Sequence, residues 1–158
     1  LDIVRWLLEE GHHAETDRAL AKIRKRGLEN ISAEEHCNGD DKMEDVCLIA
    51  EEMQKNGWCP AGQMPQSVIA WDLVRLVNLG RWAYLCDYIR EDEMWHIMQV
   101  AADTALEHFS SWEEYGRGFI MGRGVWHGDP TDSETAYEIV ELLLKNSESP
   151  WKQSMWKE

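Results

Sequence analysis

Residues 67–89 read SVIAWDLVRLVNLGRWAYLCDYI, and this stretch decides the fold. Positions 68–79 are apolar on nearly every side, which is typical of a helix that is buried all round. Four polar side chains nevertheless follow one another at intervals of three residues: Asp72, Arg75, Asn78 and Arg81. Residues at this spacing are neighbours on a helix surface. The stretch therefore predicts a buried central helix that carries a polar stripe.

The polar stripe has two interpretations, because a charge buried in a core must be paired. In the first, Asp72 and Arg75 pair within the helix, and the stripe is an ion-pair network that fixes helix packing. In the second, the stripe is a recessed site where Arg75 and Arg81 clamp an anion, since arginine binds carboxylate or phosphate with two prongs. Asp72 would then act as the acid or base.

The rest of the chain shows helical patterns with apolar residues three and four positions apart. The predicted helices are 1–10, 15–27, 41–56, 91–109, 112–126 and 134–145. Capping boxes are predicted at Ser32 with Glu35, at Ser111 with Glu114 and at Thr131 with Glu134. Ser67 is the predicted cap of the central helix, which Gly80 is expected to break or bend. No alternating strand pattern is present. We predict one all-α domain of about seven helices, with a Trp-rich core around the central helix.

The net charge of the chain limits the class of partner that it can bind. The chain has 30 acidic and 16 basic residues, a net charge of −14, which disfavours binding to nucleic acid or to anionic membranes. A basic protein partner fits this charge. No stretch approaches the roughly 20 apolar residues of a membrane span, and the acidic first residues do not resemble a secretory signal. The four cysteines show no paired spacing, so we expect reduced thiols in a cytoplasmic protein.

Four glycines interrupt the helical pattern after residue 111: Gly116, Gly118, Gly122 and Gly124. Each costs a helix about 1 kcal/mol relative to alanine, so another interaction must compensate. One interpretation is close helix–helix packing against the Trp-rich core. The other is a ligand that approaches the backbone, with Arg117 or Arg123 binding its negative group. The spacing does not match a phosphate-binding loop.

The sequence offers little for metal or covalent chemistry. Glu93 and His96 have the Glu-x-x-His spacing of metal sites, but they lie off the apolar stripe of their helix. His36 and the cysteines lack the short spacing of zinc ligands. No nucleophile elbow is present, and Cys86 lies in an apolar helix, which would raise its pKa. We expect no metal, no cofactor and no nucleophile.

Three groups of motifs resemble a known family. The first comprises Ala70-Trp71-Asp72, Arg75, Arg81-Trp82, Tyr84, Tyr88-Ile89 and Glu93-Met94-Trp95. The second comprises Phe109, Ser111-Trp112-Glu113, Gly122-Arg123 and Trp126. The third comprises Ser149-Pro150-Trp151 and Trp156, together with Trp6 and Glu10-Gly11-His12 at the start. In combination they are similar to the bacterial domain-of-unknown-function family 1266.

The resemblance spans most of the chain and is strongest over 67–126 and at the tail. It implies a bacterial, cytoplasmic protein and transfers no activity. It marks ten candidate site residues: Asp72, Arg75, Arg81, Trp82, Trp95, Ser111, Trp112, Gly122, Arg123 and Trp126. Within a single domain over 1–158, it divides the chain into N-terminal helices at 1–57, which vary more, a family-like core at 67–126, and a tail at 149–158 that packs on the core.

The functional prediction is a non-catalytic binding module that neutralises or assists a basic protein partner, for instance an immunity or accessory factor. The alternative is an enzyme or small-ligand sensor with an anion site built from Asp72, Arg75, Arg81 and Arg123. This alternative requires those side chains to converge in a pocket. A third interpretation is a structural homodimer, which would show an exposed apolar patch.

Overall fold

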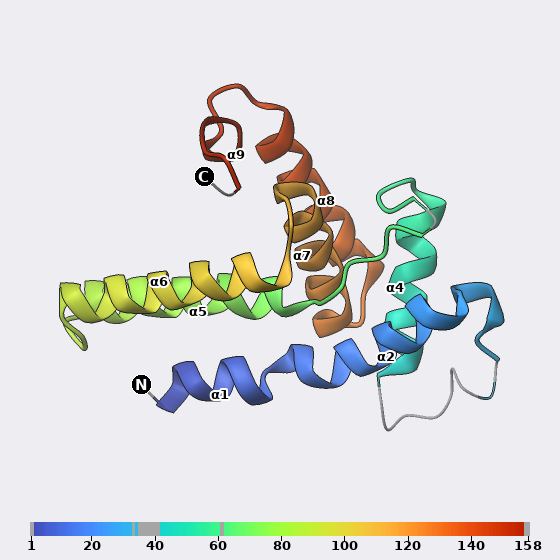
Figure 1. Ribbon diagram of the computed structural model, residues 1–158, viewed down its shortest axis with the longest axis horizontal. Coiled ribbons are helices and arrows are strands. Elements are labelled where there is room, and N and C mark those ends of the chain that lie inside the picture. Colours follow the sequence, from blue (N-terminus) through green and yellow to red (C-terminus); the bar gives the residue numbers. More distant parts are fainter. Residues whose placement is uncertain (1, 33, 35–41, 61, 157–158) are drawn as a thin grey trace.

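The computed structural model describes residues 2–32, 34, 42–60 and 62–156. This part of the chain forms seven α-helices of nine residues or more and no strand, which confirms the predicted all-α fold. The helices are α1 (Asp2–Glu10), α2 (His12–Arg26), α4 (Met43–Lys55), α5 (Ile69–Leu85), α6 (Glu91–His108), α7 (Trp112–His127) and α8 (Pro130–Lys145) (Figure 1). A 3-10 turn, η1 (Leu28–Asn30), follows α2, and the short helix α9 (Pro150–Gln153) lies near the C-terminal end.

The helices pack around α5 and α7 in two apolar clusters. Helices α5 and α6 make a long antiparallel hairpin that projects from the rest of the molecule, with α1 running beside it (Figure 1). One apolar cluster joins α1, α5 and α6 through residues such as Leu7, Leu73 and Ile97. The other joins α2, α4, α7 and α8 through residues such as Leu20 and Met121. Because α5 and α7 pack on each other, the two clusters are held together.

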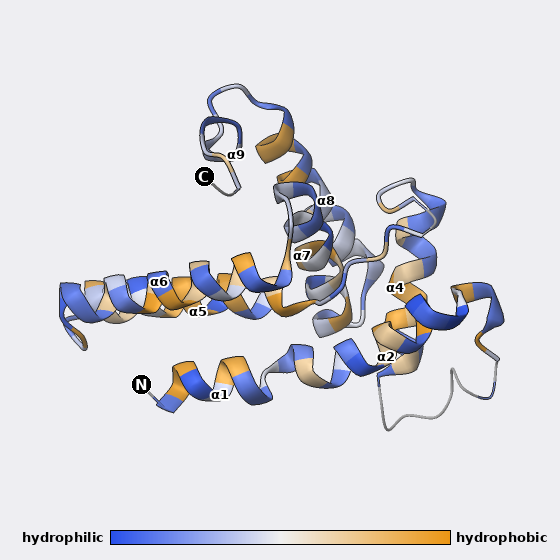
Figure 2. Cartoon of the chain, in the orientation of Figure 1, coloured by the Kyte–Doolittle hydropathy of each residue, from blue (hydrophilic) through white to orange (hydrophobic). Residues whose placement is uncertain are grey.

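Helix α5 is buried in its first half and exposed in its second. Ile69, Leu73 and Leu76 are almost completely buried, whereas Trp82 is 59% and Leu85 72% exposed. The second half projects with α6 beyond the body of the molecule, and Figure 2 shows apolar residues along both helices of this hairpin. The predicted burial of the central helix therefore ends near its middle.

The expected break at Gly80 is wrong. Helix α5 runs through this position without interruption. A side-chain Cβ at Gly80 would lie 3.1 Å from Cγ2 of Ile97 on α6. The glycine thus serves the close approach of the two hairpin helices rather than a bend.

Two helices begin earlier than the sequence predicted. Helix α2 begins at His12 instead of residue 15. Helix α8 begins at Pro130 because Asp129 is its cap, with the carboxylate accepting the N–H of Thr131 at 2.8 Å. Proline suits the first helical position, where no N–H is needed. Thr131 is therefore not the N-cap of this helix.

The other predicted caps have mixed outcomes. Ser111 caps α7, since its hydroxyl accepts the N–H of Glu114 at 3.1 Å. At the start of α5, Val68 is the N-cap, while the Ser67 hydroxyl accepts the N–H of Ile69 at 3.0 Å. Glu35, half of the remaining predicted box, lies outside the described residues.

The glycines of α7 permit close packing against other elements. A Cβ at Gly122 would lie 2.7 Å from Cβ of Trp71, and one at Gly118 would lie 2.7 Å from the carbonyl oxygen of Ser67. Both distances are well below van der Waals contact, so α7 lies directly on the start of α5. Of the two interpretations of this glycine pattern, helix packing accounts for both positions.

Candidate functional site

Asp72 lies at the centre of a buried polar cluster. Its side chain is 1% exposed, and its carboxylate accepts three hydrogen bonds. Two come from His13, through the backbone N–H at 2.9 Å and the ring Nδ1 at 2.8 Å, and one comes from Nη1 of Arg75 at 3.2 Å. Because a carboxylate faces Nδ1, that nitrogen carries the proton. Asp72 therefore fastens α2 to α5.

Gly11 makes this contact sterically feasible. A Cβ at Gly11 would lie 2.7 Å from Oδ2 of Asp72. A larger residue between α1 and α2 would push the carboxylate away from the backbone N–H of His13. The position fits glycine for reasons of space.

Arg75 continues the cluster toward the surface. Its guanidinium carbon lies 4.1 Å from the ring centre of Trp126 on α7, which is within the range of a cation–π interaction. The His12 ring meets the same indole edge-on at 5.2 Å. Burial lowers the pKa of His12 below its ordinary 6.5, with the nearby Asp72 carboxylate opposing the shift. At neutral pH the His12 imidazole is therefore uncharged.

Arg123 binds a different partner. Its guanidinium donates to Oδ1 of Asp132 on α8 at 3.3 and 3.4 Å, and His127 lies 3.5 Å from the other oxygen of Asp132. Arg123 therefore links α7 to α8.

Arg81 is remote from this pairing. It lies in the exposed second half of α5 and forms no ion pair with any residue that the structure describes. The structure thus brings Asp72, Arg75 and Trp126 together, but it leaves Arg81 on the projecting hairpin. The four residues of the predicted anion site, Asp72, Arg75, Arg81 and Arg123, do not converge on one point.

The remaining candidate site residues lie in three different places and make different contacts. Trp82 and Trp95 are each 59% exposed on the hairpin. Ser111 caps α7, and Gly122 provides its contact with α5. Trp112 belongs to an aromatic cluster with Trp151 and Trp156.

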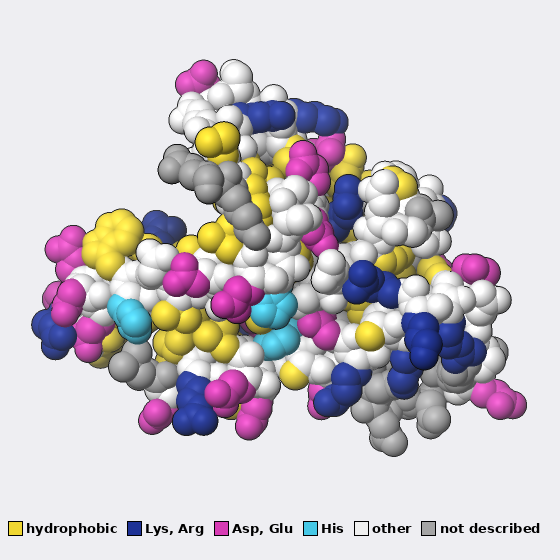
Figure 3. All heavy atoms as spheres, viewed as in Figure 1, with side chains coloured by type: hydrophobic (Ala, Val, Ile, Leu, Met, Phe, Trp, Pro, Cys, Tyr) yellow, Lys and Arg dark blue, Asp and Glu magenta, His cyan; other side chains and the backbone are white. Residues whose placement is uncertain are grey.

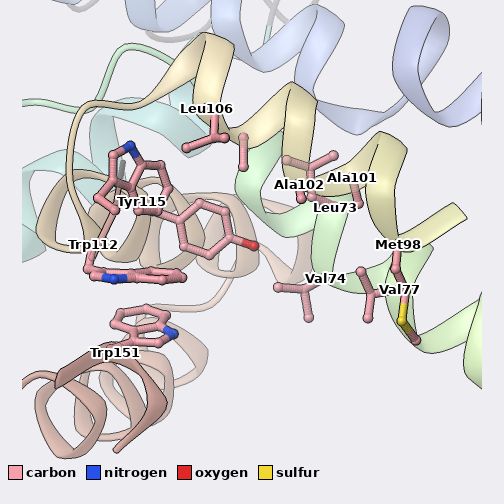
Figure 4. Close-up of a pocket in the computed structure, with 12 residues that line it drawn as sticks. Leu73, Val74, Val77, Met98, Ala101, Ala102, Leu106, Trp112, Tyr115 and Trp151 are labelled. Carbon is pink, nitrogen blue, oxygen red and sulfur yellow. The ribbon is translucent and has the colours of Figure 1, made fainter. Parts of the chain in front are cut away.

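A pocket of about 420 Å³ lies between the hairpin and the C-terminal part of the chain (Figure 4). Its walls are almost wholly apolar. Helices α5 and α6 contribute aliphatic and small side chains, and α7 and the tail contribute aromatic ones. The lining residues include Val74, Met98, Ala102, Leu106, Trp112, Tyr115, Trp151 and Trp156.

The aromatic wall of the pocket is built by α7 and the tail. Trp151 stacks on Trp112 with ring centres 4.8 Å apart, and Trp156 meets Trp112 edge-on at 4.7 Å. The indole N–H of Trp156 donates to the carbonyl of Phe109 at 2.9 Å. No tryptophan among the described residues is fully buried, and Trp112, Trp151 and Trp156 form a half-buried cluster at the edge of the apolar core.

Tyr115 supplies a polar group inside this apolar pocket. Figure 4 shows its hydroxyl pointing away from Trp112 toward Val74. Burial raises the pKa of Tyr115 to about 12, so the hydroxyl stays protonated at any ordinary pH. It has no hydrogen-bond partner among the residues that the structure describes. It is therefore available to a molecule that occupies the pocket.

A family model described as "Protein of unknown function (DUF1266)" matches residues 1–156. The chain belongs to the DUF1266 family. Neither the curated proteins nor the solved structures gave a match. The DUF1266 match includes both the Asp72 cluster and the aromatic pocket, and it confirms the family resemblance predicted from the sequence.

Several residues that shape the DUF1266 site were missed from the sequence. His13 is separated from Asp72 by 59 positions, and its role had no local signal apart from its place beside the Glu10-Gly11-His12 motif. Tyr115 was hidden within the glycine-rich helix. Cys86 was expected inside an apolar helix, which is wrong, because it is exposed at the end of α5.

The described residues of the DUF1266 chain contain neither a group of metal ligands nor a membrane span. Across 2–32, 34, 42–60 and 62–156, no three His, Cys, Asp or Glu side chains are grouped so that they could hold a metal ion. Glu93 instead accepts the backbone N–H of Arg90 at 2.9 Å, while His36 and Cys37 lie outside the described residues. In the same part of the chain, no helix combines the length and apolarity needed to cross a membrane.

Proposed function

We propose that this DUF1266 chain is a non-catalytic binding module of the bacterial cytoplasm that contacts a basic protein partner through the end of the α5–α6 hairpin. We call this end the arm and define it as residues 79–95. Large apolar side chains on the arm are strongly exposed: Trp82 59%, Leu85 72%, Tyr88 83% and Trp95 59%. This exposure is the observation that carries the proposal.

Exposed aromatic residues at such a density support a contact surface. Large apolar patches are rare on monomeric soluble proteins and usually mark interaction sites. Tryptophan and tyrosine are also enriched among the residues that contribute most binding energy at interfaces. A two-helix projection offers these side chains to a partner without disturbing the core.

The partner's charge follows from the charge of the chain. A net charge of −14 attracts a basic protein and repels a second acidic copy. On the face in Figure 3, carboxylates are spread over several elements. On this face no single acidic patch stands out, so the exposed apolar side chains of the arm are assigned the local contact.

The alternative anion site has weaker support. Arg75 binds Asp72, and Arg123 binds Asp132, at 3.2 and 3.3 Å. Two of its three arginines are thus neutralised by acids of the same chain. A homodimer remains the competing interpretation of the arm, and the experiment below separates it from a basic partner.

Comparative purification from cells of the source organism tests the proposal. Three tagged proteins would be compared: the wild type, the arm variant Leu85→Glu/Tyr88→Glu, and the control Ile139→Glu/Leu142→Glu, which alters exposed apolar residues of α8. We expect the wild type and the control to retain one basic protein in near-stoichiometric amount, and the arm variant to lose it by about tenfold or more. Equal recovery by all three, recovery of no partner, or an arm-dependent homodimer on size exclusion would overturn the proposal.

A further inference from the structure

The apolar pocket at the base of the hairpin has a shape suited to an elongated occupant. Its α6 wall runs from Met98 to Leu106, which at 1.5 Å per residue is about 12 Å. Ala102 lies between them, and its small side chain leaves space at the middle of this wall (Figure 4). Trp95, the last residue of the arm, lies one turn before Met98 and extends the same side of α6. Two to three turns of a helix match this length.

The aromatic end of the pocket would limit how far such a helix can extend. Trp112 and Trp156 close the pocket where the hairpin meets the tail. From this end the Tyr115 hydroxyl points into the pocket, away from Trp112 and toward Val74, without a partner among the described residues. The last carbonyl groups of any helix lack partners within the helix, so one of them can accept this hydroxyl's hydrogen bond.

The charge beside the pocket indicates which charge the flank of the occupant should carry. The segment 91–116, which contains all of α6, has seven acidic residues and no lysine or arginine. Asp103 and Glu107 are exposed and directly follow the lining residues Ala102 and Leu106. Lysine or arginine side chains on the occupant would therefore be attracted along the α6 side.

From these observations we infer that the pocket is a groove for an amphipathic helix of the basic partner, which inserts its apolar face between α5, α6 and the tail tryptophans. The inference rests on the proposed function and names its mode of recognition. Helices bound in grooves place apolar anchors three and four residues apart. The basic flank of this helix lies along α6, and its C-terminal end meets Tyr115.

A synthetic amphipathic peptide of leucine and lysine tests the groove, with a leucine–glutamate peptide of the same pattern as its control. Neither peptide contains tryptophan, so binding to the full chain can be followed by the fluorescence of its own indoles. The groove variant is Ala102→Arg, at an exposed lining position, and the matched control is Leu142→Arg on α8. Circular dichroism would first show that both variants are folded.

We expect the lysine peptide to bind the wild type and Leu142→Arg equally, and Ala102→Arg at least about tenfold more weakly. The glutamate peptide should not bind. No binding of the lysine peptide, or equal binding by Ala102→Arg, would overturn the inference.

The two proposals fail in different ways. If Ala102→Arg retains the cellular partner that the arm variant loses, the groove inference fails and the proposed function stands. If the arm variant retains the partner and Ala102→Arg loses it, the arm assignment fails instead.

Discussion

The Asp72 carboxylate lies 2.8 Å from Nδ1 of His13 and 2.9 Å from the backbone nitrogen of the same residue. This pair joins helices that are far apart in sequence, at a point that is nearly inaccessible to water. Asp72, which the sequence offers as the acid or base of an anion site, holds α2 against α5 through these two contacts. Its removal should act on stability.

Asp72→Ala is expected to lower the free energy of unfolding by about 3 kcal/mol, because it leaves buried donors of His13 and a partly buried Arg75 without an acceptor. Urea unfolding measures this change. Asp132→Ala is the matched control, since its pair with Arg123 is more exposed, and it should cost about 1 kcal/mol or less. Equal losses for the two variants would contradict the structural role of Asp72.

The contrast between Asp72 and Arg81 shows what the sequence could predict. Spacing placed both on one helix, correctly, because 3.6-residue periodicity is a local property. Whether a helix position is buried depends on which elements pack there, and this is set by contacts between distant segments. The segment around Arg81 belongs to the predicted central helix, whereas in the structure it projects with α6.

Helix ends show the same limit on a smaller scale. Ser111 was predicted correctly as a cap because its acceptor role needs nothing beyond the next three residues. The start of α8 was misplaced because Asp129 and Thr131 are both competent caps, and the sequence pattern favoured the wrong one. The pairing of Trp112 with Trp151 had no sequence signal, since tertiary packing alone decides it.

Gly122→Ala should destabilise the fold although alanine is the better helix former. The added methyl would lie 2.7 Å from Cβ of Trp71 and 2.9 Å from the carbonyl oxygen of Val68. Overpacking of this kind typically costs about 1–3 kcal/mol. Thermal unfolding would reveal it as a lower melting temperature. Gly80→Ala is the control, because its closest neighbour is a side-chain methyl of Ile97 at 3.1 Å, and it should cost less. A neutral Gly122→Ala would refute the close-packing account.

The burial of His12 predicts that part of the free energy of unfolding is lost at acidic pH. Its folded-state pKa is lowered, mainly by burial, so the unfolded chain takes up a proton more readily as the pH falls below about 6.5. This component is fully present above that pH and is lost below it. In urea titrations at a series of pH values, His12→Gln should lose stability less steeply on acidification than the wild type. Parallel curves would show that His12 is not the group responsible.

Ser111→Ala tests the cap of α7. Loss of the hydroxyl leaves the N–H of Glu114 without its acceptor, which should cost about 1 kcal/mol in the free energy of unfolding. Ser111→Asp should restore most of this loss, because aspartate also accepts from that N–H and interacts favourably with the helix dipole. If the aspartate variant is as unstable as the alanine variant, the hydroxyl acts through some other contact.

Contact of the arm with a basic partner, as proposed for this DUF1266 protein, can be tested directly in cells. The most direct measurement is site-specific photo-crosslinking in cells of the source organism, with a photo-reactive amino acid replacing Leu85 in one protein and Leu142 in another. Both positions are strongly exposed. We expect one prominent crosslink from position 85 to a basic protein and none to that protein from position 142. Crosslinks of equal yield from both positions, or a crosslink from position 85 to a second copy of the chain, would contradict it.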